Sequence, residues 1–273
     1  MGPVEVVLLL VFGFAVSVPM AMVGLGGGIL IVPALILVFG LPAENSVAIS
    51  LVAMTGTTLS ASIGYIRQGR VDYKLGLLYD ILDIPGVITG AYLTTILPGN
   101  ILAGLCGLLV ISIAFLLVKN RKVKHHLANE ASSRWHWRRV KVDSTNQSFE
   151  YSIRNPGFAL ISSFLSGLIG GLAGLGGGTT DTTTMILLGV PPHVAVATSE
   201  FAMALTNGVG VVAHGILQNI LWDVAIPLTI GTFIGAQVGV LTSKRAKGET
   251  LTKALIVIAF LLGIRLILLS FQV

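Results

Sequence analysis

The stretch Gly24-Leu25-Gly26-Gly27-Gly28 decides the fold, because it returns unchanged as Gly174-Leu175-Gly176-Gly177-Gly178. Each copy interrupts a hydrophobic segment. Clustered glycines weaken a helix by about 1 kcal/mol each and allow backbone conformations with positive φ. Inside a membrane such a break is tolerated only where protein or a water-filled cavity satisfies the freed backbone groups. Two matched breaks therefore predict a transport site.

The composition places the chain in the membrane. Of its 273 residues, 54% are hydrophobic and only 11% are charged, and the mean hydropathy is +0.90. These values exclude a soluble domain and predict an all-α polytopic membrane protein. The net charge of +5 comes mostly from one central loop, so it reports topology and does not indicate a nucleic-acid partner. The one cysteine, Cys106, can form no intrachain disulfide.

The hydrophobic segments fall into two similar sets. The apolar run from 4 to 40 is broken by the first glycine cluster, and its part from 29 to 40 would reach only about 18 Å as a helix, roughly half the hydrocarbon thickness. That length predicts a re-entrant hairpin or a broken helix. The run from 158 to 189 holds the second break. Full-length spans are predicted at 43–66, 74–96 and 100–118, and again at 194–215, 222–241 and 251–271.

Other matches support duplication of one unit. Gly-Leu-Pro at 40–42 corresponds to Gly-Val-Pro at 189–191, and Val-Ala-Ile-Ser at 47–50 corresponds to Val-Ala-Thr-Ser at 196–199. We therefore predict three parts: an N-terminal transmembrane repeat at 1–118, a basic loop at 119–156 and a C-terminal transmembrane repeat at 157–273. Each repeat is expected to contain one glycine-broken re-entrant hairpin and three transmembrane helices.

Basic residues predict how the repeats are oriented. Arg67, Arg70 and Lys74 follow the first full span, whereas the equivalent loop around Gln218 has no Lys or Arg. Conversely, residues 98–100 are uncharged, whereas their counterpart holds Lys244, Arg245 and Lys247. The positive-inside rule then places equivalent loops on opposite sides of the membrane, so the repeats are inverted. This topology puts the central loop in the cytoplasm and both termini outside the cytoplasmic membrane.

The central loop mixes basic residues with Trp135 and Trp137. Such a mixture can bind RNA, but positive charge next to a membrane more commonly faces anionic lipid. We therefore expect membrane lipid as a partner and no nucleic acid. The sequence leaves the oligomeric state open, a homodimer included.

The segment from Gly24 through Pro33, the Gly-x-Pro that follows it and the Ala-x-Ser ending at Ser50 resemble the TauE/SafE family of sulfite-exporter-like permeases. The resemblance covers both halves of the chain. It implies a secondary transporter that moves sulfite or an organosulfonate anion, as export, and it assigns no cofactor.

The residues themselves suggest how an anion would bind. A helix that starts after a glycine break directs unpaired N–H groups and its positive dipole end into the break, and hydroxyl groups can complete the hydrogen bonds. The competing interpretation is that the glycines only allow close helix packing. The predicted substrate-binding set lies at the two breaks and on the following spans: Gly26, Gly27, Gly28, Gly176, Gly177, Gly178, Thr179, Thr180, Ser50, Ser199 and Asn207.

Acidic residues distinguish the second repeat from the first. Asp181 follows the second break, and Glu200 lies two turns into the next span, with Asn207 on the same helical face. A carboxylate inside the membrane costs several kcal/mol unless it is paired, hydrated or protonated. We therefore predict Asp181 or Glu200 as the carrier of a coupled proton. Asp80 and Asp83 lie three residues apart on another span, with Asp80 expected to be a hydrated charge near the interface.

Three alternatives to an anion carrier are a divalent cation transporter, an enzyme, and a sensor or scaffold. A divalent cation transporter could use Asp80, Asp83, Asp181 and Glu200 as oxygen ligands, although the chain lacks a paired His/Asp motif and no metal site is predicted. An enzyme is not expected, because the glycine clusters are not followed by the residues of a dinucleotide or Walker motif. A sensor or scaffold is the third class.

Overall fold

The computed structural model describes residues 2–23, 26–123, 136–144, 146–154, 156–242 and 248–271. Gly24 and Leu25, which open the first copy of the repeated pentapeptide, lie outside these ranges. The side chains of Val23, Arg154, Pro156, Thr179, 116–136 and 248–256 are also outside the description.

Helices make up most of the described chain. In chain order they are α1 (Pro3–Val23), α2 (Gly28–Leu37), α3 (Ala43–Arg67), α4 (Tyr73–Ile96), α5 (Gly99–Val123), α6 (Pro156–Ala173), α7 (Gly178–Leu187), α8 (Pro192–Ile216), α9 (Trp222–Thr242) and α10 (Gly248–Ser270). Strands β1 (His136–Val142) and β2 (Ser148–Arg154) lie between α5 and α6. The six spans predicted as full-length helices match α3, α4, α5, α8, α9 and α10 closely.

Within the described residues, five helices are long and apolar enough to cross a membrane: α1, α3, α4, α8 and α9. The distribution of side chains agrees with that environment. Large apolar side chains such as Val11, Ile161 and Leu241 are exposed on the outside, whereas Asp83 and Glu200 are fully buried. A soluble protein shows the reverse arrangement. The chain is a multi-pass helical membrane protein.

The two short helices, α2 and α7, end in the same way. Gly40 and Gly189 take positive φ values of 65° and 100° just after these helices. The next helices then begin after Pro42 and Pro191, which occupy the N-cap positions of α3 and α8. A left-handed glycine stops a helix and a following proline cannot continue it, so the Gly-x-Pro motifs set these boundaries.

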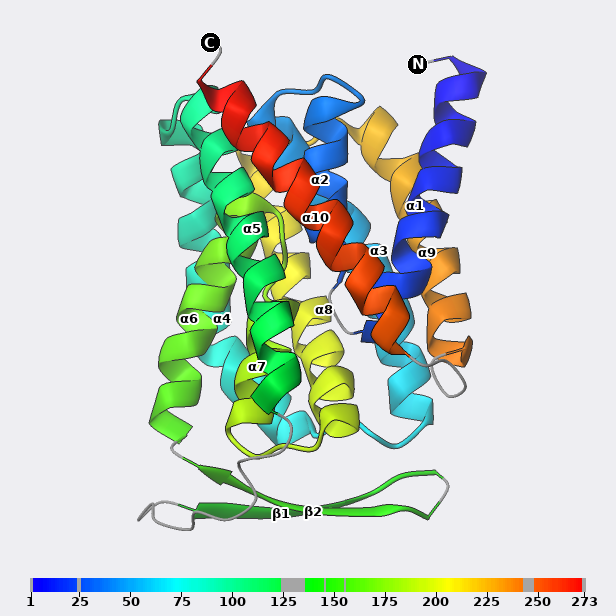
Figure 1. Cartoon of the computed structure of the whole chain (residues 1–273), viewed down its shortest axis with the longest axis vertical. Coiled ribbons are helices and arrows are strands. Elements are labelled where there is room, and N and C mark those ends of the chain that lie inside the picture. Colours follow the sequence, from blue (N-terminus) through cyan, green and yellow to red (C-terminus); the bar gives the residue numbers. More distant parts are fainter. Residues whose placement is uncertain are drawn as a thin grey trace.

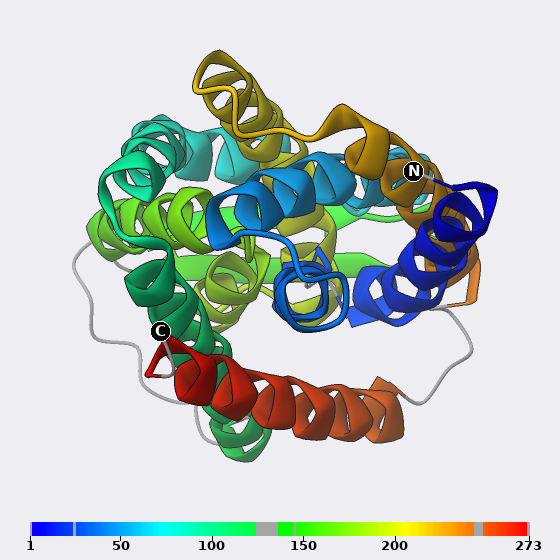
Figure 2. The ribbon, with the colours of Figure 1, turned by 90° about the horizontal axis from the view of Figure 1, so that it is seen from above.

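Figure 1 shows the course of the short helices. α1 descends from the N-terminus and α2 returns toward the same end of the bundle, whereas α6 rises from the β-hairpin and α7 returns toward it. Viewed along the bundle in Figure 2, α2 lies inside a ring of longer helices, with α10 along one flank. Nine of the ten residues of α2 are buried, as this position requires.

Glycines join the first half of the chain (α1–α5) to the second half (α6–α10). Gly231, Gly235 and Gly239 are four residues apart on α9, and all three face α1. A β-carbon added at Gly231 would lie 2.2 Å from the carbonyl oxygen of Leu10, so only glycine permits this approach. Small residues at this spacing let membrane helices pack backbone to backbone.

The same arrangement joins α4 to α6. Gly86 and Gly90 of α4 face Gly167 and Gly171 of α6 across the contact. A β-carbon at Gly171 would lie 2.1 Å from the carbonyl oxygen of Val87. The fourth helix of each half therefore packs on the first helix of the other half. These glycines lie outside the two breaks and pack their helices closely, which is the role that the competing interpretation gave to the glycines of the breaks.

The central segment is not only a loop, because β1 and β2 pair there as an antiparallel hairpin. Side chains alternate across it: Tyr151 and Ile153 are buried, whereas Val140 and Val142 are exposed. The buried face packs against Leu75 and the ends of α7 and α8. Figure 1 shows the hairpin crossing the end of the bundle opposite the two termini. The prediction of a purely helical fold was wrong in this segment.

Candidate functional site

The two glycine breaks lie against each other in the interior of the bundle. A β-carbon added at Gly28 would lie 2.2 Å from the carbonyl oxygen of Gly174 and 2.6 Å from the Cα atom of Leu175. Gly26 and Gly176 have positive φ values of 69° and 64°, backbone conformations that residues other than glycine rarely adopt. The breaks bring together the N-terminal ends of α2 and α7, which begin at Gly28 and Gly178.

The helices that begin at the two breaks have no side-chain caps. Gly27 is the N-cap of α2 and Gly177 is the N-cap of α7, and neither supplies a side chain to cap its helix. The first N–H groups of a helix have no partner within the helix, and the helix dipole adds positive potential there. The arrangement therefore suits a negatively charged group.

Two methionines occupy the space between the breaks. A β-carbon at Gly26 would meet the Met54 methyl carbon at 2.4 Å and the Met203 sulfur at 3.4 Å. At Gly176 the same two side chains would lie 2.1 and 3.7 Å away. Met54 on α3 and Met203 on α8 are both fully buried. Methionine is the most flexible of the large apolar side chains, so Met54 and Met203 can change conformation with little rearrangement of the helices.

The two matched serines have different partners. Ser50 on α3 donates its hydroxyl proton to the carbonyl oxygen of Gly174 at 2.7 Å, so this proton is already used within the second break. Ser199 on α8 lies with its hydroxyl 2.5 Å from that of Thr182 on α7, and 3.1 Å from the carbonyl oxygen of Val196. Both serines thus brace α7 and its break against the long helices.

The other predicted polar residues are Thr179, Thr180 and Asn207. Thr180 is half-buried on the first turn of α7, and its carbonyl oxygen accepts a hydrogen bond from Thr184 at 2.7 Å. The Thr179 side chain lies outside the described residues. Asn207 is buried on α8, and its side-chain nitrogen has no hydrogen-bond partner.

Glu200 is the carboxyl that faces the first break. It is 0% exposed, and neither carboxylate oxygen has a hydrogen-bond partner. The backbone N–H of Gly26 is close enough to act on its charge, although without ordinary hydrogen-bond geometry. An unpaired carboxylate buried at this depth is unstable in its ionised form. Glu200 therefore requires a proton or a positively polarised neighbour.

Asp181 is the corresponding carboxyl at the second break. It is also 0% exposed and lacks a partner on either oxygen. The Ser166 hydroxyl lies close to it but donates to the carbonyl oxygen of Gly177 at 2.9 Å. The charges of Asp83 and Asp80 both act on Asp181. The sequence predicted the two buried carboxyls, and the structure places one beside each break.

Asp80 and Asp83 are both buried, so the prediction that Asp80 is a hydrated charge at the interface was wrong. Their shared neighbour, Thr206 on α8, lies with its hydroxyl oxygen 2.8 Å from Oδ1 of Asp80 and 2.9 Å from Oδ2 of Asp83. No role was predicted for Thr206, because its partners are more than 120 residues away in the chain.

Asp72, just before α4, connects the hairpin to the bundle. Arg139 of β1 and Tyr151 of β2 both donate hydrogen bonds to its carboxylate, the latter at 2.6 Å. Its backbone N–H donates to the Thr198 hydroxyl of α8 at 3.0 Å. Burial favours the neutral acid, but the bonds from Arg139 and Tyr151 outweigh burial and hold the pKa of Asp72 below its ordinary value. Burial, and then the Asp72 carboxylate, raises the pKa of Tyr151.

A second contact joins the hairpin turn to the loop between α3 and α4. Arg70 donates to Asp143 through Nε and Nη2 at 3.3 and 3.2 Å. The Ser144 backbone N–H donates to the carbonyl oxygen of Gln68 at 2.9 Å. Arg70 and the basic central loop, which contains Arg139, were predicted to lie in the cytoplasm, and the structure shows that both arginines form ion pairs within the protein.

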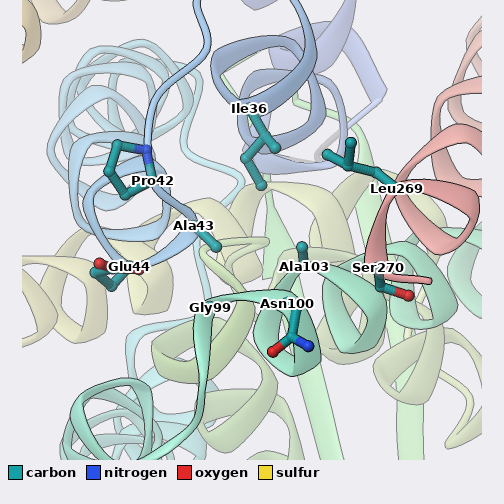
Figure 3. Close-up of a pocket in the computed structure, with 9 residues that line it drawn as sticks. All are labelled: Ile36, Pro42, Ala43, Glu44, Gly99, Asn100, Ala103, Leu269 and Ser270. Carbon is teal, nitrogen blue, oxygen red and sulfur yellow. The ribbon is translucent and has the colours of Figure 1, made fainter. Parts of the chain in front are cut away.

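A pocket of about 260 Å³ lies elsewhere, near the C-terminal end of α2. Figure 3 shows its lining, which is apolar apart from Glu44, Asn100 and Ser270. Since α2 runs from this pocket at Ile36 to the break at Gly28, the two regions are at opposite ends of one helix. The buried carboxyls and the helix N-termini lie at the break, and we place the candidate site there. Within the described residues, no three His, Cys, Asp or Glu side chains are grouped as metal ligands.

Apolar membrane-spanning helices around a polar interior, with two helix breaks meeting inside, define the class of multi-pass membrane transporters. Residues 9–266 match the sulfite exporter TauE/SafE family, and the chain belongs to that family. It is 32% identical to the probable membrane transporter protein YunE of Bacillus subtilis (strain 168) over 270 residues, which cover 96% of this chain and 97% of that protein.

Other relatives carry similar names. The chain is 29% identical to the probable membrane transporter protein ORF9 of Sinorhizobium sp over 247 residues, covering 89% of this chain and 85% of that protein. Over 75 residues it is 39% identical to the sulfite exporter TauE/SafE family protein 3 of Arabidopsis thaliana, covering 28% of this chain and 16% of that protein. No solved structure matches the chain significantly.

Proposed function

We propose that this protein is a secondary carrier that exports sulfite or an organosulfonate anion across the cytoplasmic membrane. The observation that supports it is the meeting of two helix N-termini at glycine breaks in the bundle interior. Their N–H groups and dipoles favour a small oxyanion. The substrate class follows the name of the family to which the chain belongs.

The buried carboxyl groups beside the two breaks suggest proton coupling. Asp181 and Glu200, one beside each break, would repel an anion when ionised and tolerate it when protonated. Substrate binding and proton binding would therefore favour each other at one site. In this proposal, Met54 and Met203 must move aside for the anion to reach the N–H groups of both helices.

We propose an inverted topology for the two halves. The opposite courses of the α1–α2 and α6–α7 pairs support re-entrant hairpins that enter from opposite faces (Figure 1). In this arrangement the β-hairpin is cytoplasmic, facing anionic lipid through Arg138 and other exposed basic groups, and the termini are outside. Single cysteines at Arg70 and Gln218, in a Cys106→Ser background, should react with an impermeant thiol reagent from opposite sides of the membrane. Reaction of both from one side would contradict the inverted arrangement.

The test of function is flux into proteoliposomes that contain the purified protein. Sulfite and methanesulfonate should move, and an imposed pH gradient should drive their accumulation, whereas divalent cations should not move. Methanesulfonate is useful because it stays a monoanion at all working pH values. Transport of divalent cations instead of these anions would support the cation alternative and reject the proposal.

The residues are tested in the same assay. Asp181→Asn and Glu200→Gln keep the size of each side chain but remove its titration, so at least one should abolish the response to the pH gradient. Asp223→Asn is the matched control, because Asp223 is exposed in the first turn of α9. Unchanged pH dependence in both buried variants would exclude these carboxyls as proton carriers.

A further inference from the structure

The contacts of Thr206 favour a proton on one of two aspartates. Its hydroxyl oxygen is within hydrogen-bond distance of Asp80 Oδ1 and Asp83 Oδ2. A hydroxyl group has one proton to donate and otherwise only accepts. If both aspartates were ionised, the single hydroxyl proton would have to be shared between two carboxylates in a weaker three-centre bond. A proton on one carboxyl satisfies both contacts: that carboxyl donates to Thr206, while Thr206 donates to the other.

The surrounding charges favour the same conclusion. Asp83 is 0% and Asp80 is 4% exposed, and each has a second oxygen without a hydrogen-bond partner. On α4, α7 and α8 the one Lys or Arg is Lys74, which is exposed at the start of α4. Two buried like charges on one partner cannot both persist without a compensating cation.

We propose that Asp80, Thr206 and Asp83 form a proton-binding site in which the two carboxyls share one proton through the threonine hydroxyl. The proton moves when the protonated carboxyl gives its O–H proton to the Thr206 oxygen and Thr206 gives its own proton to the other carboxylate. No charge is created in this exchange, and no other reactant is needed. The ligand of the site is the proton itself.

The position of Asp83 links this site to the breaks. Its unpartnered Oδ1 is 2.8 Å from where a β-carbon of Gly167 on α6 would lie. The neighbouring residue, Ser166, donates to the Gly177 carbonyl oxygen, and a β-carbon on Gly177 would lie 2.8 Å from Asp181 Oδ2. Asp83 and Asp181 thus flank the Ser166-Gly167 dipeptide. We infer that this site holds the proton that passes to Asp181, a step that rests on the proposed function.

The other titratable groups around the site are few. From α4 itself, the Tyr79 hydroxyl is buried without a partner and is acted on by the charges of Asp181 and Asp83. From α7 the facing group is Asp181. The described part of α6 has no titratable side chain. On α8, Glu200 faces Gly26 and His214 bonds the carbonyl oxygen of Gly171 through Nε2 at 3.1 Å.

Infrared spectroscopy of the purified protein tests the site without any substrate. In an Asp181→Asn, Glu200→Gln background at neutral pH, we expect one protonated-carboxyl C=O band that shifts in D2O. Thr206→Val should move this band to higher frequency because the hydrogen bond is lost, whereas Thr206→Ser should leave it unchanged. Thr94→Val is the matched control, since the Thr94 hydroxyl on α4 bonds only the Ala91 carbonyl oxygen at 2.7 Å. Absence of the band, or its insensitivity to Thr206→Val, would overturn the proposal.

Transport then tests what the proton does. Asp80→Asn and Asp83→Asn should retain methanesulfonate exchange in the absence of a gradient but lose accumulation driven by a pH gradient. Accumulation equal to that of the natural protein in both variants would overturn the coupling role. If the natural protein exchanges neither methanesulfonate nor sulfite, the transport assignment fails, and the infrared band still decides whether the proton site exists.

Discussion

At Gly28 the absence of a side chain allows the two glycine breaks to touch in the interior of the bundle. The nearest atoms to a β-carbon at this position are a backbone oxygen of Gly174 and the Cα atom of Leu175. Backbone atoms cannot rotate away as a side chain can. The contact between the two breaks therefore depends on glycine here, whereas Gly208 on α8 has nothing within 4 Å of its β-carbon position.

We predict that Gly28→Ala destabilises the protein by about 3 kcal/mol, the upper end of the usual cost of overpacking. Gly208→Ala should be neutral or stabilising by up to about 1 kcal/mol, because alanine favours the helix. Thermal unfolding followed by circular dichroism in one detergent compares the two variants. Equal stability of both would show that the breaks do not touch as described.

For single residues, the sequence identified the important polar side chains better than it predicted which groups they bond. Asp181 and Glu200 were identifiable because a carboxyl in an apolar segment is costly wherever its neighbours lie. Ser50 stays a predicted substrate-binding residue, and the sequence did not predict that its hydroxyl donates to the carbonyl oxygen of Gly174, 124 residues away. Thr206 was overlooked for the same reason, since a threonine in a membrane helix usually bonds its own backbone.

At the scale of elements, the β-hairpin is the part that sequence analysis missed. Trp137, Arg139 and Lys141 alternate with Arg138, Val140 and Val142, which is the two-residue period of a strand. The many basic residues of this segment predicted a loop next to anionic lipid instead. Two of these basic side chains instead contact the protein: Arg139 pairs with Asp72 and lies over the Trp137 ring, and Lys141 lies over the Tyr73 ring. The helix positions were predictable because their apolar runs are long and uninterrupted.

We predict that Asp72→Asn loosens the hairpin. Its carboxyl is 1% exposed and accepts from Arg139, whose side chain is 23% exposed. We expect a cost of roughly 2 kcal/mol, less than for a fully buried pair. Trypsin should then cleave after Arg138, Arg139 and Lys141 faster than in the natural protein. Glu150→Gln is the control, because it breaks the Arg138–Glu150 pair, which is 79% and 62% exposed and contributes little. Equal resistance of both variants to trypsin would contradict the prediction that Asp72 holds the hairpin against the bundle.

The hydrogen bonds of Asp72 to Arg139 and Tyr151 also predict the pH range over which the hairpin stays docked on the helix bundle. The pKa of Asp72 is lowered from 3.8, so its contribution is fully present above that pH and is lost as the pH falls through the lower value. The pKa of Tyr151 is raised from 10.0, so its contribution declines only as the pH rises above 10.0. Docking should therefore be constant from about pH 5 to about pH 9. Fluorescence of Trp137 in a Trp135→Phe, Trp222→Phe background measures it, and a transition near neutral pH would contradict this assignment.

At the scale of the whole molecule, the two halves are not independent bodies. α1 packs on α9 and α4 packs on α6, so each half supplies the partner for the first helix of the other. Further bonds cross between α3 and α9, including Ser60 to the carbonyl oxygen of Phe233 at 2.7 Å and Gln237 to the carbonyl oxygen of Ser60 at 2.8 Å. The sequence showed the repetition, but repetition alone does not say which helices become neighbours.

We predict that residues 1–123 and 124–273, produced as two chains in one cell, assemble and co-purify, whereas either chain alone is degraded. The physical reason is that each chain alone exposes a glycine surface and buried carboxyl or hydroxyl groups that the other chain covers. Gly231→Leu should abolish co-purification because its side chain would enter the Leu10 backbone, and Gly208→Leu should not. A stable, monodisperse first half by itself would contradict this interdependence.

The pairing of α1 with α9 also sets an order of events during synthesis. Roughly 200 residues separate these helices, so at about 5–20 residues per second α1 is made some 10–40 s before its partner. Throughout that interval the Ser17 face of α1, against which Gly235 later packs, is without its final neighbour. α1 therefore reaches its native position only after α9 has been synthesised, and quality control in the cell acts on the protein while α1 still lacks its partner.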